Sequence, residues 1–360
     1  MVFEMKKVLL IEFNFFHDEV VIPLIDVLSN IENIELHCIL NEDIKKRNTF
    51  ILTDNKYKIK KILYFKKELA IYKQFLNFKY IYDTYKYILK NNIDIIIFNT
   101  LDVYNLDVKF LLNLVPNNIK VLGVLHNTNI VSKKFLKKID TVILLNECIK
   151  YNYKKEVFYP ILYKYKNIIN IYNKNIITIP GNIEYGRRNY KFLLNFVKKN
   201  KYFCHEYQIK FNLLSNINKD DGPEVFEFIK QNSLQDFFIL HDGFVEYDKF
   251  IKNLQNSFLI MPLLNNESYL RYKTSAAFNM AFSLNIPLFL EDKFIYKCNL
   301  FDNFSYCYKE NNYNDLLNTL KEAIYNRSKY IDKINNIFSY QKFSLNYQLE
   351  NFKRLFFNDN

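Results

Sequence analysis

The chain has 360 residues, enough for two domains with cores of ordinary size. Hydrophobic residues make up 49% and mean hydropathy is −0.18, which excludes a disordered chain, and no apolar run approaches the roughly 20 residues that a membrane-spanning helix needs. The net charge of +12 is uneven, because residues 51–180 carry 22 Lys and Arg against 9 Asp and Glu. A basic half of this kind indicates an anionic partner such as a phospholipid surface, a lipid-linked diphosphate or nucleic acid, or else a merely solvated lysine-rich surface.

The first residues, MVFEMKKVLLIEFNFF, begin like a signal peptide. Glu4 and Glu12 interrupt the apolar run, however, and no small-residue cleavage site follows it, so we expect a first β-strand instead. The five cysteines include no C-x-x-C pair, and their odd number fits a reducing compartment. The five histidines are scattered without metal-ligand spacing. The sequence therefore predicts a cytoplasmic chain without a bound metal.

Apolar runs of strand length alternate with segments of helical periodicity along the whole chain. Continuous hydrophobic strands are those buried on both faces of a parallel sheet, so the pattern predicts an α/β fold of two doubly wound, Rossmann-like parallel-sheet domains. The expected strands are 7–12, 34–39, 94–98, 120–125 and 141–145, then 175–179, 209–214, 237–241, 257–261 and 287–290. The expected helices are 19–30, 77–90, 188–199, 223–232, 246–256 and 313–326.

The alternation breaks near 159–174, so we expect a first domain over 1–165 and a second over 166–340. Residues 329–357 read as a long helical tail, and its end, 341–360, is expected to pack back on the first domain. Two domains of this kind face one another across a central cleft at the carboxyl ends of their strands, where ligands bind in open parallel sheets. The residues just after each strand are therefore the candidates for a site.

In the first domain, the segment after the first strand contains no glycine, so no phosphate-cradling loop is predicted there. His17 in that segment could face an acceptor. His126 follows the fourth strand and opens a polar tetrad, where a ligand could reach it. An isolated histidine also serves as a structural hydrogen-bonding group, and both interpretations of His126 remain open.

In the second domain, Gly181 ends a strand and permits close backbone approach. Arg187 and Arg188 precede a helix and offer bidentate contacts to phosphate. Two arginines at a helix start oppose the helix dipole, so a nearby anion explains them better than a structural role does. After a later strand, Gly243 and Phe244 could support a nucleotide base or ribose.

Lys273, Thr274 and Ser275 lie where a helix of small residues begins, after a loop that contains Glu267. A helix amino terminus leaves four N–H groups unpaired and carries roughly half a positive charge, which suits a phosphate. Ser and Thr are also common N-caps for purely structural reasons. The combination with Lys273 favours a diphosphate and sugar site, and hence a nucleotide-activated substrate.

Residues 176–295 resemble the donor half of GT-B fold glycosyltransferases, and the nearest type is the retaining, nucleotide-sugar-dependent family 4 (glycosyl transferases group 1). The resemblance is carried by Pro180-Gly181…Arg188-Asn189-Tyr190, His241-Asp242-Gly243-Phe244-Val245, Pro262…Glu267…Lys273-Thr274-Ser275 and Asn285-Ile286-Pro287. The first domain resembles the family mainly in layout, together with His126-Asn127. The glycine-rich loop after the first strand is missing, and the second carboxylate of the paired-glutamate motif is replaced by Ser275 or Thr274.

The resemblance implies a role for each residue that matches the motifs. His126 would touch the transferred sugar and Glu267 would face the donor sugar, both as catalytic residues. The donor diphosphate would be bound by Arg187, Arg188, Lys273, Thr274 and Ser275. The nucleotide or sugar would be bound by Gly181, Asn182, Gly243, Phe244 and Asn266.

The implied reaction is transfer of a hexosyl group from a nucleoside diphosphate sugar to a hydroxyl of a surface glycan or lipid-linked acceptor, as in lipopolysaccharide or capsule polysaccharide biosynthesis. Configuration would be retained, and neither a metal nor another cofactor would be needed. The first domain would bind the acceptor and an anionic membrane surface, with peripheral attachment to the inner face of the plasma membrane; nucleic acid is not expected. A catalytically degenerate GT-B partner or glycan-binding subunit and a nucleotide-sugar epimerase remain alternatives.

Overall fold

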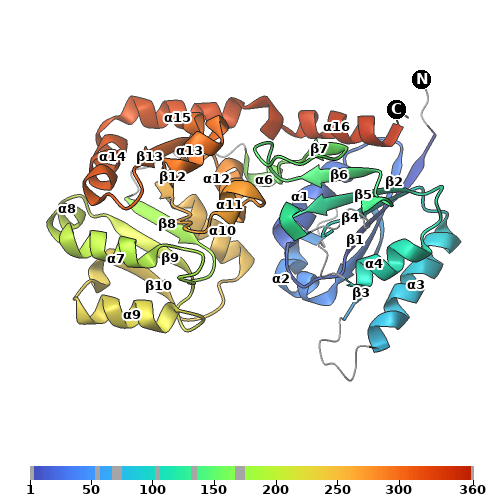
Figure 1. Cartoon of the computed structure of the whole chain (residues 1–360), viewed down its shortest axis with the longest axis horizontal. Helices are drawn as coiled ribbons and strands as arrows, with labels where there is room; N and C mark the ends of the chain where they lie inside the picture. Colours follow the sequence, from blue (N-terminus) through green and yellow to red (C-terminus); the bar gives the residue numbers. More distant parts are fainter. Residues whose placement is uncertain are drawn as a thin grey trace. The chain divides into compact units, whose positions relative to one another are not determined.

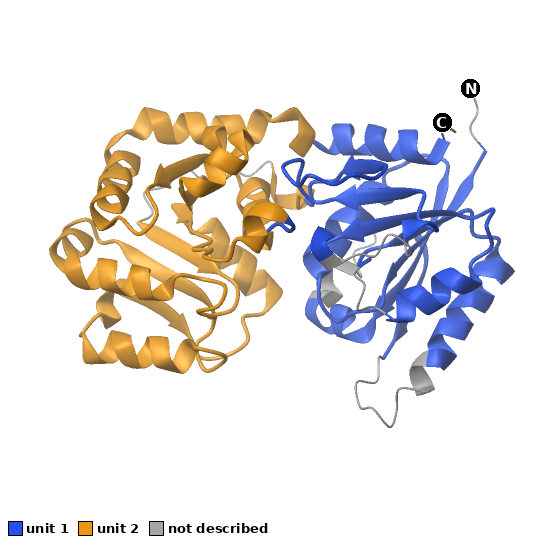
Figure 2. Ribbon diagram, in the orientation of Figure 1, with its two compact units in different colours: residues 1–160, 272–274, 344–360 blue, residues 161–271, 275–343 orange. Residues whose placement is uncertain are grey.

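The computed structural model describes residues 4–52, 57–66, 75–101, 106–130, 136–166 and 175–357 (Figure 1). The chain divides into two compact units (Figure 2). Unit 1 comprises residues 1–160, 272–274 and 344–360, and unit 2 comprises residues 161–271 and 275–343. The break expected at 159–174 lies partly outside the described residues, since 167–174 are not among them.

Unit 1 contains a seven-stranded sheet in which every pair of neighbouring strands is parallel, in the order β3-β2-β1-β4-β5-β6-β7. The strand order reverses between β1 and β4, which makes their carboxyl ends the switch point of the sheet. Its elements are β1 (Lys6–Glu12), α1 (Asp18–Leu28), β2 (Ile34–Asn41), α2 (Glu42–Leu52), β3 (Ile59–Phe65), α3 (Phe75–Asn91), β4 (Ile95–Phe98), α4 (Leu106–Leu114), β5 (Lys120–Leu125), the 3₁₀ turn η2 (Thr128–Ile130), β6 (Thr141–Leu144), β7 (Lys155–Val157) and α16 (Leu345–Phe357).

Unit 2 contains a six-stranded sheet, also parallel throughout, in the order β10-β9-β8-β11-β12-β13. Its first elements are α6 (Tyr163–Lys166), β8 (Ile176–Pro180), α7 (Tyr190–Lys199), α8 (Lys201–Glu206), β9 (Lys210–Asn216), α9 (Gly222–Gln231), η3 (Gln235–Phe237), β10 (Phe238–His241) and α10 (Tyr247–Gln255). They are followed by β11 (Leu259–Ile260), α11 (Ser268–Arg271), α12 (Ala276–Ser283), β12 (Leu288–Glu291), α13 (Lys293–Lys297), η4 (Asn299–Phe304), β13 (Ser305–Tyr308), α14 (Tyr313–Tyr325), α15 (Arg327–Ser339) and η5 (Gln341–Phe343).

The predicted fold class, two doubly wound parallel-sheet α/β domains, is confirmed. Each of the ten expected strands overlaps an observed strand, and each of the six expected helices overlaps an observed helix. The strands that the sequence pattern missed are β3, β7 and β13, which lie at sheet edges. Edge strands tolerate charge and polarity, and β3 (IKKILYF) and β7 (KEV) carry lysines that break the apolar run.

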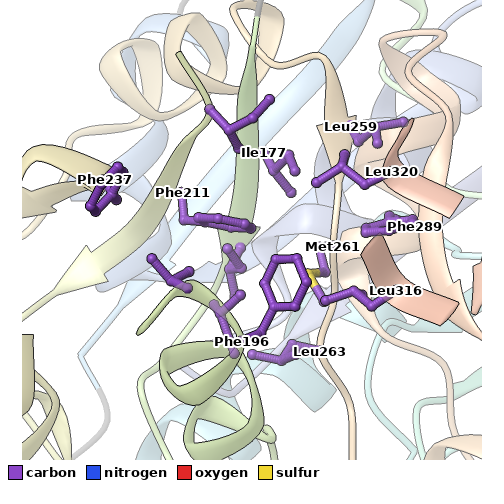
Figure 3. Close-up of a cluster of buried hydrophobic side chains, with 14 of the residues drawn as sticks. Ile177, Phe196, Phe211, Phe237, Leu259, Met261, Leu263, Phe289, Leu316 and Leu320 are labelled. Carbon is purple, nitrogen blue, oxygen red and sulfur yellow. The ribbon is translucent and has the colours of Figure 1, made fainter. Parts of the chain in front are cut away.

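Alternate side chains of the central strands build the core of unit 2 (Figure 3). Phe211 of β9 and Phe289 of β12 extend from the sheet, Phe196 of α7 covers it, and Leu316 and Leu320 of α14 close the cluster. Each of these side chains is at most 1% exposed, so the whole set is removed from water. Burying a side chain of this size contributes about 1.5–3 kcal/mol, which explains why the continuous apolar runs dictate the sheet.

The closing residues form two helices and not the single long helix that the periodicity of 329–357 predicts. α15 ends at Ser339, the 3₁₀ turn η5 intervenes, and α16 begins at Leu345. α16 belongs to unit 1, where the ring of Phe352 lies 5.7 Å from that of Phe158 and Arg354 Nη2 lies 3.1 Å from Glu156 Oε1.

Lys166 anchors two helix ends inside unit 2. Its ammonium group is buried and donates hydrogen bonds to the carbonyl oxygens of Phe282 (2.9 Å) and Ile337 (2.8 Å) and to Asn285 Oδ1 (2.8 Å). Phe282 and Ile337 lie in the last turns of α12 and α15, where carbonyl groups lack partners within their own helix. In the described part of the chain, no carboxylate forms an ion pair with Lys166, and burial lowers the pKa of Lys166 to about 7.

Because the folded chain loses this proton near pH 7 and the unfolded chain keeps it until about pH 10.4, the free energy of unfolding should rise with pH between these values. The contribution is about 1.4 kcal/mol per pH unit where only the unfolded chain is protonated. We expect Lys166→Met to remove this rise, measured by urea unfolding from pH 7 to 9. Lys164→Met, at an exposed position, is the control. Identical pH dependence in the wild type and Lys166→Met would contradict the assignment.

Candidate functional site

A buried carboxylate organises the carboxyl edge of the unit 1 sheet. Glu12, the last residue of β1, is 1% exposed and accepts hydrogen bonds from Asn14 N (2.7 Å), Asn99 Nδ2 (2.6 Å) and Thr100 Oγ1 (2.5 Å). Burial raises the pKa of Glu12, and these three hydrogen bonds oppose the rise. Asn99 and Thr100 directly follow β4, so Glu12 joins the two strands that flank the switch point.

Two histidines stack on one another beside this network. The rings of His17 and His126 lie 3.5 Å apart between centroids and 20° from parallel. Asn99 holds both residues, since its Nδ2 donates to His17 O (3.2 Å) and its carbonyl oxygen accepts from His126 Nε2 (2.7 Å). The second contact fixes the proton of His126 on Nε2 and leaves Nδ1 as an acceptor. Burial, aided by the neighbouring His17, holds the pKa of His126 well below its usual range.

His17 has a left-handed backbone conformation (φ 67°, ψ 23°), which is uncommon for a residue with a side chain. Its carbonyl oxygen accepts from the backbone N–H groups of Val20 and Val21 as α1 begins. Its Nδ1 lies 3.2 Å from Glu19 Oε1. A histidine paired with a carboxylate through Nδ1 presents Nε2 as a proton acceptor, so the arrangement is suited to general base chemistry.

His17, Glu19 and His126 also bring three potential metal ligands within 4.8 Å of one another, the one such group in the part of the chain that the structure describes. Metal ions bind imidazole nitrogens in the plane of the ring, along the lone pair. Because the two rings are stacked, their lone pairs lie in two nearly parallel planes about 3.5 Å apart, and one ion cannot lie in both planes unless a ring rotates. The geometry therefore fits proton chemistry better than metal binding.

The segment Tyr272–Thr274 belongs to unit 1, although its neighbours in sequence belong to unit 2. Lys273 pairs with Asn127 in an antiparallel bridge, and Thr128 N donates to Tyr272 O (2.9 Å). Within unit 1 the structure thus brings Lys273 next to the residue that follows His126. The hydroxyl of Thr274 is buried and has no hydrogen-bond partner.

In unit 2, Arg188 is buried rather than exposed. Its side chain lies under Gly181, whose positive φ of 96° suits glycine, and a Cβ added there would lie 2.6 Å from Arg188 Nη2. Arg188 is 4% exposed, and Nη2 donates to Pro180 O (2.6 Å). Nε and Nη1 have no hydrogen-bond partner, and among the described residues no carboxylate forms an ion pair with this guanidinium. Burial lowers the pKa of Arg188.

Arg187, in contrast, contacts polar neighbours of its own unit and is partly exposed. Its Nη2 and Nε donate to Tyr269 Oη (2.7 and 3.1 Å), and Nη1 lies 3.3 Å from Glu184 Oε1. The loop after β11 runs beside the two arginines, since Asn265 N donates to Arg187 O (3.1 Å) and Leu264 forms a bridge with Arg188. The structure therefore brings the predicted arginine segment and the predicted Glu267 loop together within unit 2.

Another buried polar group near Arg188 also lacks a partner. It is the hydroxyl group of Tyr190, which lies within electrostatic range of the Arg188 guanidinium. Buried polar groups are satisfied in the great majority of cases, so several orphan groups in one neighbourhood call for an explanation. A bound polar ligand is one such explanation.

The remaining predicted residues of unit 2 are exposed or serve the local fold. Glu267 is 72% exposed at its side chain and pairs with Arg271 (2.8 Å). Asn266 Oδ1 accepts from Ser268 N (2.9 Å) at the start of α11. Three further predicted residues lie on loops at the carboxyl edge of the sheet: Asn182, which donates to Glu184 Oε1 (3.0 Å), Gly243, which has open space around it, and Phe244, which is 68% exposed.

Ser275 is the N-cap of α12. Its Oγ accepts from Ala277 N at 3.4 Å, a long hydrogen bond, and the residue is buried. The capping role expected as the alternative for this residue is therefore present. Lys273 and Thr274, which precede it, are grouped with unit 1.

Sequence reasoning did not single out Glu12, Asn99 and Thr100 as members of the site. The sequence does contain a signal for these three residues. Glu12 ends one apolar strand, and Asn99 and Thr100 follow another, so all three lie at carboxyl ends of parallel strands, where ligands bind. Glu19, in the first turn of α1, and Tyr269 carry no sequence signal that points to a ligand.

A surface pocket of about 240 Å³ lies elsewhere in unit 1. It is lined by residues around the end of α4 and the start of β5, including Val115, Pro116 and Asp140. Because it adjoins the amino end of β5, it lies away from the switch point and has no part in the candidate site.

No protein-family model and no curated protein sequence matches the chain. Among solved structures the chain is similar to a glycosyltransferase from Rickettsia africae, with 13% identity, a TM-score of 0.67 and 98% of each chain covered. It is also similar to the lipopolysaccharide outer core galactosyltransferase WaaB (14% identity, TM-score 0.58, 97% of this chain and 100% of that one). A third similar structure is the UDP-GlcNAc 2-epimerase from Methanocaldococcus jannaschii, with 16% identity, a TM-score of 0.55, and 89% of this chain and 93% of that chain covered. Likeness at these identities establishes a shared fold, and the expected GT-B architecture is confirmed.

Two substitutions of Glu12 should show whether its hydrogen bonds or its negative charge stabilise the fold. Glu12→Leu leaves the donors on Asn14, Asn99 and Thr100 unpaired, and we expect the free energy of unfolding to fall by about 1–3 kcal/mol or more. Glu12→Gln should cost less, because its carbonyl oxygen can still accept from Asn14 N and its amide can donate to the Thr100 hydroxyl. Urea unfolding of both variants checks this. Equal stability of Glu12→Leu and the wild type would contradict the network.

Proposed function

We propose that the chain is a glycosyltransferase that moves a sugar from a nucleoside diphosphate sugar to a hydroxyl group. The observation that carries this proposal is the buried guanidinium of Arg188, whose Nε and Nη1 have no partner. An isolated buried charge costs several kcal/mol. A diphosphate would offset that cost with charge-assisted hydrogen bonds, which are among the strongest in proteins.

The same group explains the chemistry of the proposed reaction. As the glycosidic bond breaks, negative charge grows on the departing diphosphate, and a cation held away from water stabilises it strongly. We assign the diphosphate to Arg187, Arg188, Lys273, Thr274 and Ser275. The nucleotide and sugar are assigned to Gly181, Asn182, Gly243, Phe244 and Asn266, with Glu267 toward the donor sugar. Contact with Arg188 requires the loop beside it to admit the ligand, since the side chain is closed off from solvent.

Unit 1 supplies the acceptor side of the proposal. His126 is assigned to the transferred sugar, and its neutral ring, held by Asn99, suits hydrogen bonding rather than ion pairing. We assign to His17, which is paired with Glu19, the role of taking the proton of the acceptor hydroxyl. Retention, which the family resemblance implies, does not need such a base, because the departing phosphate can accept the proton. The anomer of the product, read by proton NMR, separates the two routes.

A surface glycan or lipid-linked acceptor, in the biosynthesis of lipopolysaccharide or capsule polysaccharide, remains the proposed context. A basic segment over residues 51–180 supports an anionic partner. In the described residues, no helix combines the length and apolar character that crossing a membrane demands. Cytoplasmic location with peripheral attachment to the inner face of the plasma membrane completes the proposal.

Nucleotide-sugar epimerisation is the second candidate, favoured by structural neighbours named as UDP-GlcNAc 2-epimerases. An epimerase converts its donor without an acceptor, so incubation with nucleotide sugars alone followed by chromatography separates the two activities. Binding of a nucleotide sugar without turnover, with or without acceptors, would favour a catalytically degenerate partner subunit.

Arg188→Met should stabilise the free protein and abolish donor binding. Removing a buried charge that lacks a counter-ion should raise the free energy of unfolding by about 1–3 kcal/mol, even after loss of the bond to Pro180 O. A thermal-shift screen against UDP-, GDP-, ADP- and CMP-sugars should give a stabilising ligand for the wild type and none for the variant. Arg327→Ala, at an exposed position in unit 2, is the control. A destabilised variant that binds donor normally would assign Arg188 a structural role.

Chelation of divalent metals should leave turnover unchanged. The proposed diphosphate charge is balanced by arginine, lysine and helix N–H groups, so EDTA should alter the rate by less than about twofold, within the scatter of such effects. Activity that vanishes with EDTA and returns with Mg²⁺ or Mn²⁺ would contradict this part of the proposal.

A further inference from the structure

Helices α3 and α4 expose large apolar side chains in two regular rows. Phe78, Tyr82 and Leu89 lie on α3, and Leu106, Phe110 and Leu114 lie on α4, each between 44% and 60% exposed. Spacings of three, four and seven residues put side chains on one face of a helix. We call these six residues the apolar rows.

The two rows form one surface. α3 and α4 pack side by side on the same face of the sheet (Figure 1). The rings of Phe78 and Phe110 meet edge to face with 5.2 Å between their centroids. The opposite sides of these helices already supply the core, through Ile81 and Ile88 of α3 and Val108 and Leu111 of α4. Folding of unit 1 therefore does not account for the apolar rows, and contiguous exposed apolar surface marks an interaction site.

Lysines flank the apolar rows. Lys79, Lys86 and Lys90 of α3 and Lys109 of α4 are exposed, and Lys86 Nζ lies 4.4 Å from the centre of the Tyr82 ring. Of the acidic residues of these two helices, Asp83 is exposed and Asp107 is buried. The surface therefore combines aromatic and aliphatic side chains with an excess of positive charge.

We propose that the α3–α4 face docks on an anionic lipid bilayer. Helices lying in a membrane interface place Phe and Leu at the boundary of the acyl chains and Lys among the headgroups. Each lysine near an anionic surface strengthens the attraction to it. A second copy of this chain fits less well, because facing copies would bring the same lysines together. Docking of this face would bring the proposed glycosyltransferase to a lipid-linked acceptor. Vesicle binding itself can be measured without any glycosyl transfer.

The test is co-sedimentation of the full chain with vesicles of phosphatidylcholine alone or with about a third phosphatidylglycerol. The wild type should sediment with anionic vesicles and not with neutral ones. Phe78→Ser with Phe110→Ser should weaken partitioning at least about tenfold, as should Lys86→Glu with Lys90→Glu. Tyr202→Ser with Tyr296→Ser, which changes two side chains of unit 2 that are each 82% exposed, should have no effect.

Far-ultraviolet circular dichroism establishes that each variant is folded, and sedimentation velocity gives its oligomeric state. Equal binding by the wild type and the Phe78 and Phe110 variant would overturn the proposal. So would a wild-type dimer that this variant converts to a monomer, since the surface would then be a contact between copies. Vesicle binding without any glycosyl transfer would leave this inference standing and refute the proposed function alone.

Discussion

Parallel strands buried on both faces leave one kind of place for polar chemistry, the edge where their carboxyl ends emerge. In unit 1 this constraint gathers Glu12, Asn99 and the two histidines at the reversal of strand order, held by hydrogen bonds of 2.6–3.2 Å. In unit 2 it gathers the segment after β8 and the loop after β11 around Arg188. Burial of the apolar side chains stabilises the sheets, and the carboxyl edges of the sheets are where the polar residues become accessible to a ligand.

Arg188 shows how stability and function oppose one another at such an edge. In the folded chain the guanidinium of Arg188 makes one hydrogen bond, to Pro180 O, and burying it with Nε and Nη1 unpaired costs stability, which the proposed diphosphate would offset. Lys166 is the contrasting case: it is as buried as Arg188, but its three acceptors are all supplied by unit 2 itself, and its role is to join helix ends. The two buried cations therefore differ in how far unit 2 itself satisfies their N–H groups, and only Arg188 is proposed to bind a ligand.

The fold could be predicted from the sequence because its signal, continuous apolar runs such as KVLLIE and DIIIF, is local and energetically large. Edge strands such as β3 could not be predicted in this way, because their lysines interrupt the continuous apolar run. The candidate site was harder, since its residues meet only after folding. Arg188 could be proposed from its place before a helix, but its burial under Gly181 depends on a positive φ and on packing that no local pattern encodes. The stacking of His17 on His126 joins residues far apart in the chain, and Glu267, chosen by motif, lies in solvent.

The most direct test of the central claim is a crystal structure of the chain with the nucleoside diphosphate of whichever donor binds. We expect a phosphate oxygen within about 3 Å of Nε and Nη1 of Arg188, the hydrogen-bond distance for such a pair. A bound nucleotide that leaves both nitrogen atoms unpaired, with Gly181 and the loop after β11 unmoved, would contradict it.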